Sequence, residues 1–294
     1  MLFRSSFYFP LRQMAVLWSS LQLALAAVDR ISEVLALESN MPVRPADGAA
    51  SSSASDVLKF EQVRFSYSGG KEEVLRSATF TLKRGQTYAL VGPTGGGKTT
   101  TASLMARLYD PTSGRVLLDG KDIRSYAPEE RTRKIGFILQ EPFLFTGTIR
   151  DNVLYGNERY HKSSDDELIG LLNEKNVGGL LARFEQGLQT KVASTGDAIS
   201  LGQKQIVAFM RAVLRDPEIL ILDEATANID TVTEQQLDQI LQRLPVSTTK
   251  VIIAHRLNTI ANADEIFFIN SGEITPAGSM EHALEMLMHG KRVS

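Results

Sequence analysis

The sequence of 294 residues contains no cysteine. Disulfide bonds and thiolate metal sites are therefore excluded, and the lack of thiols is compatible with both the cytosol and export. An excess of charge of one sign is also lacking, since the sequence has 32 lysines and arginines and 34 aspartates and glutamates, a net charge of −2. Since 43% of the residues are hydrophobic and there is no basic surplus, the composition indicates a globular protein that does not bind nucleic acid.

A long uninterrupted apolar run is lacking too. The stretch Met14–Val28 is shorter than the ~20 residues that span a bilayer. Within residues 1–39, apolar side chains recur at helical spacing at Leu11, Met14, Trp18, Leu21, Leu25, Val28 and Leu35. Three interpretations stay open: an amphipathic helix, a secretory signal preceded by Arg4 and Arg12, or the end of a membrane helix that runs into the cytoplasm.

The chain divides into three segments by composition. Residues 40–56 contain two prolines, one glycine and four serines in Asn40–Ser55 and have no apolar period, which predicts a flexible linker. Residues 57–294 form the globular part, and no internal repeat is evident in it.

Strand and helix patterns alternate through this globular part. Strands are predicted over residues 58–67, 78–82, 88–91, 116–118, 134–140, 219–222, 251–254 and 266–269. Helical spacing covers residues 100–108, most of 147–215, and 280–289. The runs at 219–222 and 251–254 are continuously apolar, as in parallel strands that are buried on both faces. The alternation predicts an α/β core.

The most informative motif follows the strand predicted over residues 88–91. It fits G-x-x-x-x-G-K-[ST] and consists of Gly92, Pro93, Thr94, Gly95, Gly96, Gly97, Lys98 and Thr99, with Thr100 opening a helix. Glycines let consecutive backbone N–H groups point inward, and the helix N-terminus adds partial positive charge. Lys98 can then reach the β- and γ-phosphates of a nucleotide, and the Thr99 hydroxyl can bind Mg²⁺.

Two carboxylates, Asp223 and Glu224, end the buried strand that begins at Ile219. An aspartate at this position faces the phosphate site in P-loop ATPases and contacts Mg²⁺. Glu224 is placed to act on an attacking water as general base. The alternative is a pair of solvated carboxylates in a turn.

Taken in order, these motifs resemble those of the nucleotide-binding domain of an ABC transporter, most closely the exporter half-transporters for drugs, lipids or peptides. The resemblance runs from Asp56 to about Gly278. It rests on Tyr67, the loop at 92–99, Gln140, I-S-L-G-Q at 199–203, I-L-I-L-D-E at 219–224, Asp230 and His255. It implies a P-loop ATPase core with an antiparallel β subdomain and an inserted helical subdomain over about residues 141–215, preceded by a long N-terminal helix.

The resemblance also implies a role for each matching residue, with ATP and Mg²⁺ as cofactors. Tyr67 would stack on adenine, unless it is a buried strand aromatic. Gln140 would sense Mg²⁺ and the γ-phosphate and relay occupancy to the helical subdomain. His255 would hold the γ-phosphate and the water near Glu224. Asp230 would belong to the loop that joins two ATP sites, although Asp230 or Thr231 also fits a helix N-cap.

Ser200 and Gln203 have the spacing of a capping box. In the family this helix end, with Gly202, binds the γ-phosphate of ATP held by a partner subunit, so two domains enclose two nucleotides. Leu201 departs from the usual L-S-G-G-Q because it replaces a glycine that lies close to phosphate. That departure favours a heterodimer with a second half-transporter over a homodimer. Glycine at position 96, where serine or cysteine is common, is expected to be harmless.

The segment 1–39 is similar to the end of the sixth membrane helix and its cytoplasmic extension. The preceding membrane helices are absent from the sequence, so we expect that this chain alone forms no transport pathway. The resemblance implies a cell (inner) membrane location with the domain on the cytoplasmic side. The expected function is ATP hydrolysis that powers export; the alternatives are a soluble ABC ATPase without transport and a regulatory cassette that does not hydrolyse ATP.

Overall fold

The computed structural model describes residues 2–37, 41–45, 53–67, 72–193, 199–223, 231–253, 262–278 and 280–289. Contacts divide the chain into two compact units, Met1–Pro42 and Val43–Ser294. The first unit is built on one helix, α1 (Leu2–Leu35), with Pro10 inside it. Its part Tyr8–Leu35 is long and apolar enough to cross a membrane. The expectation that the apolar segment is too short is therefore wrong; a signal sequence near the N-terminus meets the same criteria.

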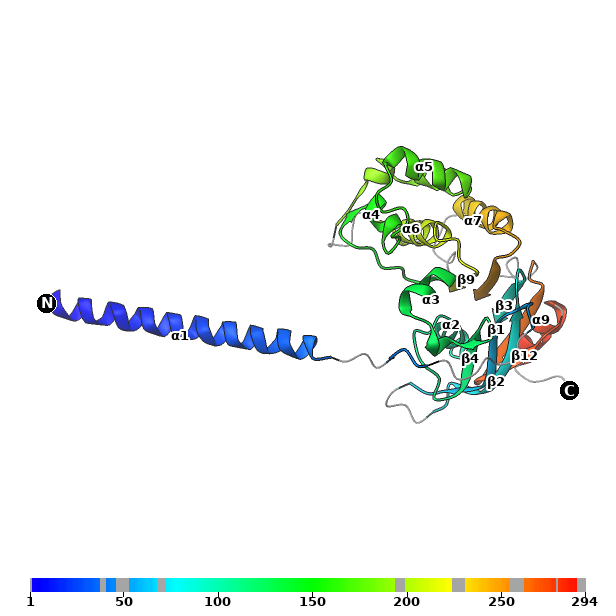
Figure 1. Ribbon diagram of the computed structural model, residues 1–294, viewed down its shortest axis with the longest axis horizontal. Coiled ribbons are helices and arrows are strands. Elements are labelled where there is room, and N and C mark those ends of the chain that lie inside the picture. Colours follow the sequence, from blue (N-terminus) through cyan, green and yellow to red (C-terminus); the bar gives the residue numbers. More distant parts are fainter. Residues whose placement is uncertain are drawn as a thin grey trace. The chain divides into compact units, whose positions relative to one another are not determined.

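The second unit contains two large sheets (Figure 1). The four-stranded antiparallel sheet has the order β2-β1-β4-β5 and is formed by β1 (Asp56–Phe65), β2 (Leu75–Lys83), β4 (Ser113–Leu118) and β5 (Lys121–Asp122). The six-stranded sheet has the order β12-β11-β3-β10-β9-β6. Its parallel strands are β3 (Thr87–Val91), β6 (Ile135–Ile138), β9 (Ile219–Asp223), β10 (Thr249–Ile253) and β11 (Glu265–Asn270), and β12 (Glu273–Pro276) runs antiparallel to β11.

Helices α4 (Ile149–Leu154), α5 (Asp165–Glu174) and α6 (Leu201–Val213) gather apart from the antiparallel sheet (Figure 1). Between α4 and α6 lie the 3₁₀ turns η2 (Gly178–Arg183) and η3 (Gly187–Gln189), and a small sheet pairs β7 (Gly147–Thr148) with β8 (Lys191–Val192). The remaining helices are α2 (Lys98–Met105), α3 (Pro128–Lys134), α7 (Thr231–Arg243) and α9 (Met280–His289), with a 3₁₀ turn η1 (Ile123–Ser125).

Strand β9 explains why the core sequence is continuously apolar. Alternate residues of a strand point to opposite faces. Leu220 and Leu222 belong to the hydrophobic core that contains α6, whereas Ile219 and Ile221 belong to the core beneath the antiparallel sheet. Because both faces of the strand are covered, it has no solvent face that would take polar residues.

The predicted α/β core with its antiparallel sheet and helical region is confirmed, and the errors concern the ends of two strands and several short strands. Strand β6 stops at Ile138 and β1 stops at Phe65, so Gln140 and Tyr67 lie two residues beyond the ends of their strands. The helical spacing over residues 147–215 missed the β7-β8 pair, which interrupts the helices. Strand β12 was also missed, because its four residues form a short edge with only partial burial.

Candidate functional site

The loop between β3 and α2 is closely packed against strand β11. A Cβ on Gly92, whose φ is 146°, would lie 1.9 Å from the carbonyl oxygen of Ile269, so only glycine fits there. A Cβ on Gly96 would lie 2.7 Å from the same oxygen, so a serine or cysteine here requires a backbone shift. Glycine at position 96 fits this packing without such a shift.

Lys98 is folded back over this loop. Its Nζ donates hydrogen bonds to the carbonyl oxygens of Gly92 (2.9 Å) and Pro93 (3.0 Å), and the residue is only 6% exposed. Helix α2 begins after Gly97, which has a left-handed backbone and offers no side-chain cap. A helix N-terminus without a side-chain cap, next to a lysine ammonium, is a favourable place for an anion.

Asp223 joins the loop from the neighbouring part of the sheet. It is the last residue of β9, is 3% exposed, and accepts a hydrogen bond of 3.3 Å from the Thr99 hydroxyl. Strands β3, β10, β9 and β6 are parallel, so their carboxyl ends meet at one edge of the sheet, where α/β folds bind ligands. A hydroxyl and a carboxylate oxygen side by side fit Mg²⁺, which prefers hard oxygen ligands.

Gln140 lies at the same edge, two residues after β6, with an exposed side chain. Its backbone carbonyl accepts a hydrogen bond of 3.1 Å from Nε2 of Gln205 on α6. The predicted sensor is therefore connected to the helical region through its main chain.

Tyr67 is 40% exposed and lies beyond the end of β1, so it is not a buried strand aromatic. Its hydroxyl is 2.9 Å from Oγ1 of Thr100, the third residue of α2. Edge-to-face contacts with Phe65 (centroids 4.8 Å apart) and Tyr109 (5.2 Å) fix the ring. An exposed aromatic ring anchored to the phosphate loop can offer one face to a base.

The second predicted anion site is the start of α6. Ser200 and Gln203 form the predicted capping box: Gln203 N donates to Ser200 Oγ (3.2 Å) and Ser200 N donates to Gln203 Oε1 (3.0 Å). Gln203 Nε2 also donates to the carbonyl of Arg183 (2.8 Å). Leu201 is the first residue of the helix and is half-buried, and Gly202 follows it.

Three predicted site residues lie outside the described part of the chain: Glu224, Asp230 and His255. Their neighbours are described, since β9 ends at Asp223 and β10 at Ile253. Their roles stay predictions.

Sequence reasoning missed an exposed aromatic cluster, which we define as Phe143, Phe145 and Tyr155. Phe145 stacks on Tyr155 with centroids 4.1 Å apart and meets Phe143 at 5.1 Å. The guanidinium of Arg211 lies 5.6 Å from the Tyr155 ring. Burial, reinforced by the neighbouring Arg215, lowers the pKa of Arg211 to about 10. The only signal of this cluster in the sequence is the pair of aromatic residues at 143 and 145. Tyr155 is ten residues further along the chain and joins the cluster only in the folded structure.

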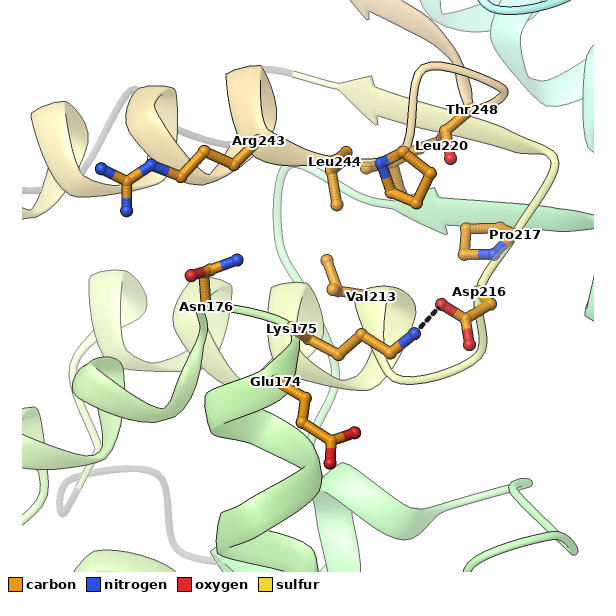
Figure 2. A pocket seen from close by; sticks show the side chains of 11 residues that line it. Glu174, Lys175, Asn176, Val213, Asp216, Pro217, Leu220, Arg243, Leu244 and Thr248 are labelled. Atoms are coloured by element: carbon orange, nitrogen blue, oxygen red, sulfur yellow. Dashed lines mark hydrogen bonds and ion pairs between the residues drawn. The ribbon is translucent and has the colours of Figure 1, made fainter.

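A separate cavity of about 160 Å³ lies between the ends of α5, α6 and α7 (Figure 2). Lys175 and Asp216 form an ion pair at its edge, and Arg243 and Asn176 also line it (Figure 2). None of the predicted site residues lines it. Its ion pair connects the end of α5 to the turn between α6 and β9.

A glycine loop between a strand and a helix, an inward lysine, and a carboxylate at the end of a parallel strand of the same sheet define a P-loop nucleotide-binding domain. Residues 75–227 match the family described as ABC transporter. The chain belongs to the ABC transporter family.

Known relatives agree with this assignment. The chain is 40% identical over 281 residues to the uncharacterized ABC transporter ATP-binding protein YfiC of Bacillus subtilis, which covers 94% of this chain and 45% of YfiC. It is 39% identical over 269 residues to the probable multidrug resistance ABC transporter ATP-binding/permease protein YheH of the same bacterium. That match covers 92% of this chain and 39% of YheH. The solved structure of a bacterial Atm1-family ABC exporter with ATP bound matches this chain with a TM-score of 0.74 and 30% sequence identity. The match covers 96% of this chain and 49% of the exporter chain. The chain thus spans less than half the length of these proteins.

Proposed function

We propose that this chain binds ATP with Mg²⁺ and hydrolyses it to power export across a membrane. One observation carries the proposal: Lys98, Thr99 and Asp223 converge at the carboxyl edge of the parallel sheet, with the Thr99 hydroxyl 3.3 Å from Asp223. An ammonium, a hydroxyl and a carboxylate in this arrangement match the phosphate and metal ligands of P-loop ATPases.

The residues would divide the work as follows. Lys98 would exchange the neutral carbonyls of Gly92 and Pro93 for the β- and γ-phosphates, because a charged acceptor makes the stronger hydrogen bond with an ammonium. Thr99, Asp223 and Gln140 supply oxygen ligands to Mg²⁺, which neutralises phosphate charge when bound. Glu224 takes a proton from the attacking water, and His255 orients that water and the γ-phosphate. Tyr67 holds the adenine.

We place the chain at the cell (inner) membrane, with the nucleotide-binding domain on the cytoplasmic side. Two features support this. Helix α1 is long and apolar enough to cross a membrane, which fits residues 1–39 as the end of a membrane helix and its extension. Two residues of the exposed aromatic cluster, Phe143 and Phe145, lie a few residues after Gln140, and Arg211 lies beside the third, Tyr155. An exposed aromatic patch of this kind is expected of a surface that a partner covers. The membrane part of the transporter is the partner we assign to it.

The second partner is another nucleotide-binding domain. The start of α6 is shaped by its capping box and by the hydrogen bond from Gln203 to Arg183. We assign this helix end to an ATP bound by the partner, so two copies of the domain would complete two sites. Leu201 places a bulky side chain at that helix start. We therefore favour a heterodimer in which this chain supplies the phosphate loop and its partner supplies an L-S-G-G-Q helix start, with Asp230 in the loop between the two sites.

Two substitutions test this function in the full chain. Lys98→Ala should abolish tight MgATP binding in a fluorescence titration, because it removes the inward cation. Glu224→Gln should preserve binding but slow hydrolysis by about 10²–10⁴-fold, the usual contribution of a general base. Lys191→Ala, an exposed lysine on β8, is the control and should change neither. Equal ATP affinity for Lys98→Ala and the parent would refute the proposal.

A further inference from the structure

Helix α6 holds the beginning of the loop that carries Gln140. We define the Gln140 loop as residues 139–146, between β6 and β7. Gln205 on α6 is 1% exposed, and its Nε2 donates to the Gln140 carbonyl oxygen at 3.1 Å. Its Oε1 is also buried and has no hydrogen-bond partner among the described residues. A buried amide costs free energy unless its hydrogen bonds are made, so a simple packing role would be better filled by an apolar residue.

The same helix also reaches the end of this loop. Asn152 on α4 is fully buried and pairs with Phe145 in both directions, through N–H to Oδ1 (2.8 Å) and Nδ2 to the carbonyl (2.8 Å). Arg211 on α6 donates from Nε to the Asn152 carbonyl (2.7 Å) and from Nη2 to Oδ1 (3.3 Å). Helix α6 thus fixes both ends of the Gln140 loop, directly through Gln205 and indirectly through Arg211 and Asn152.

We propose that Gln205 is a positioning residue that locks the main chain of Gln140 to α6, so that the Gln140 side chain reaches Mg²⁺ only when α6 is in register with it. This inference rests on the proposed function. Helix α6, which carries Gln205, begins at Leu201 and is capped by Ser200. This capped helix start is the part that would bind the partner's ATP. One hydrogen bond therefore connects the metal end of this chain's own site with the helix that acts on the partner's site.

Gln205 can be altered without touching Lys98, Thr99 or Asp223. Gln205→Met keeps the length of the side chain but removes the donor, and Gln205→Glu places a carboxylate oxygen against the Gln140 carbonyl. In the full chain we expect both variants to bind ATP normally in EDTA. The affinity of the ATP complex for Mg²⁺ should fall about tenfold, at the lower end of the 10–100-fold effect of residues that orient metal ligands. Without nucleotide, amides of residues 141–146 should exchange hydrogen faster.

Met210→Ala is the matched control, since Met210 is equally buried on α6 and its loss weakens the helix packing without removing a hydrogen bond to the loop. It should lower stability but leave Mg²⁺ affinity unchanged. The proposal is overturned if both Gln205 variants keep the parental Mg²⁺ affinity and the parental hydrogen exchange of the loop. It is also overturned if Met210→Ala loses as much Mg²⁺ affinity as the Gln205 variants do. If the parent shows no Mg²⁺-dependent ATP binding, the proposed function fails, while loop exchange still tests the connection to α6.

Discussion

Single residues at the phosphate loop act through short contacts that cross from one element to another. Tyr67 follows a strand of the antiparallel sheet, whereas Thr100 belongs to the helix after the loop, and their hydroxyl groups lie 2.9 Å apart. The contact fixes the distance between an aromatic face and the phosphate cradle. Such spacing is what a ligand with a base at one end and phosphates at the other requires.

Tyr67→Ala should weaken ATP binding by about 5- to 150-fold, because base stacking on an aromatic residue contributes about 1–3 kcal/mol. Tyr67→Phe keeps the ring and loses only the hydrogen bond to Thr100, so its affinity should stay close to that of the parent. Fluorescence titrations with ATP and with tripolyphosphate measure both effects. Tripolyphosphate has no base, so an equal loss for both ligands in Tyr67→Ala would contradict adenine stacking. Tyr155→Ala serves as the control for removal of an exposed aromatic residue.

At the scale of elements, four charged side chains connect the two large sheets. Arg84 contacts Asp119 and Glu218 at 2.6 and 2.5 Å, and Lys134 contacts the same two carboxylates at 2.8 and 2.5 Å. Arg84 precedes β3, Asp119 follows β4, Lys134 ends α3 and Glu218 precedes β9. Burial raises the pKa of Glu218, but hydrogen bonds from Lys134 and Arg84 outweigh it and leave the pKa lowered.

Glu218→Gln should therefore lower the free energy of unfolding at pH 7 by about 1–2 kcal/mol, between the values for exposed and buried ion pairs. Since the folded-state pKa of Glu218 is lowered, its contribution is present above the ordinary value of 4.5 and is lost as the pH falls below it. The difference between parent and variant in urea unfolding should shrink from pH 7 to pH 4. Glu73→Gln, which removes an exposed pair with Arg64, should cost less at pH 7. A difference that is independent of pH would contradict the ionic role.

At the scale of the whole molecule, the half-buried Leu201 affects whether two copies of this chain can form an active homodimer or need a different partner. It lies at the first position of α6, where backbone angles are helical, so glycine is not required there by conformation. Any effect of Leu201 must then come from its side chain beside an incoming phosphate. The capping box of Ser200 and Gln203 does not involve that side chain and should persist without it.

If the heterodimer proposal holds, homodimers of the parent should hydrolyse ATP slowly. Leu201→Gly should then raise the hydrolysis rate by at least about tenfold. This is a modest part of the roughly 10²–10³-fold rate effect of one well-placed hydrogen-bond donor. The measurement is ATPase rate against protein concentration. Leu201→Ala separates side-chain bulk from backbone flexibility, since alanine removes the bulk and keeps the helix propensity. A parent homodimer as fast as Leu201→Gly would instead favour an ordinary homodimer.

The sequence by itself determined the local features: the strand, glycine loop and helix around Lys98, the capping box at Ser200, and the buried strand that ends in Asp223. These depend on side-chain period and turn chemistry within a few residues, which the sequence displays directly. It also placed Gln140 and Tyr67 near the ends of strands, although both strands stop two residues earlier.

Only the tertiary structure decided which of these features meet. Thr99 and Asp223 are 124 positions apart, and they touch because β9 lies next but one to β3 in the sheet. Gln205 and Gln140 are 65 positions apart and meet because α6 packs against β9 and β6 in one core. The order of strands and the packing of helices on them arise from the burial of all apolar faces together, so no local pattern reveals them.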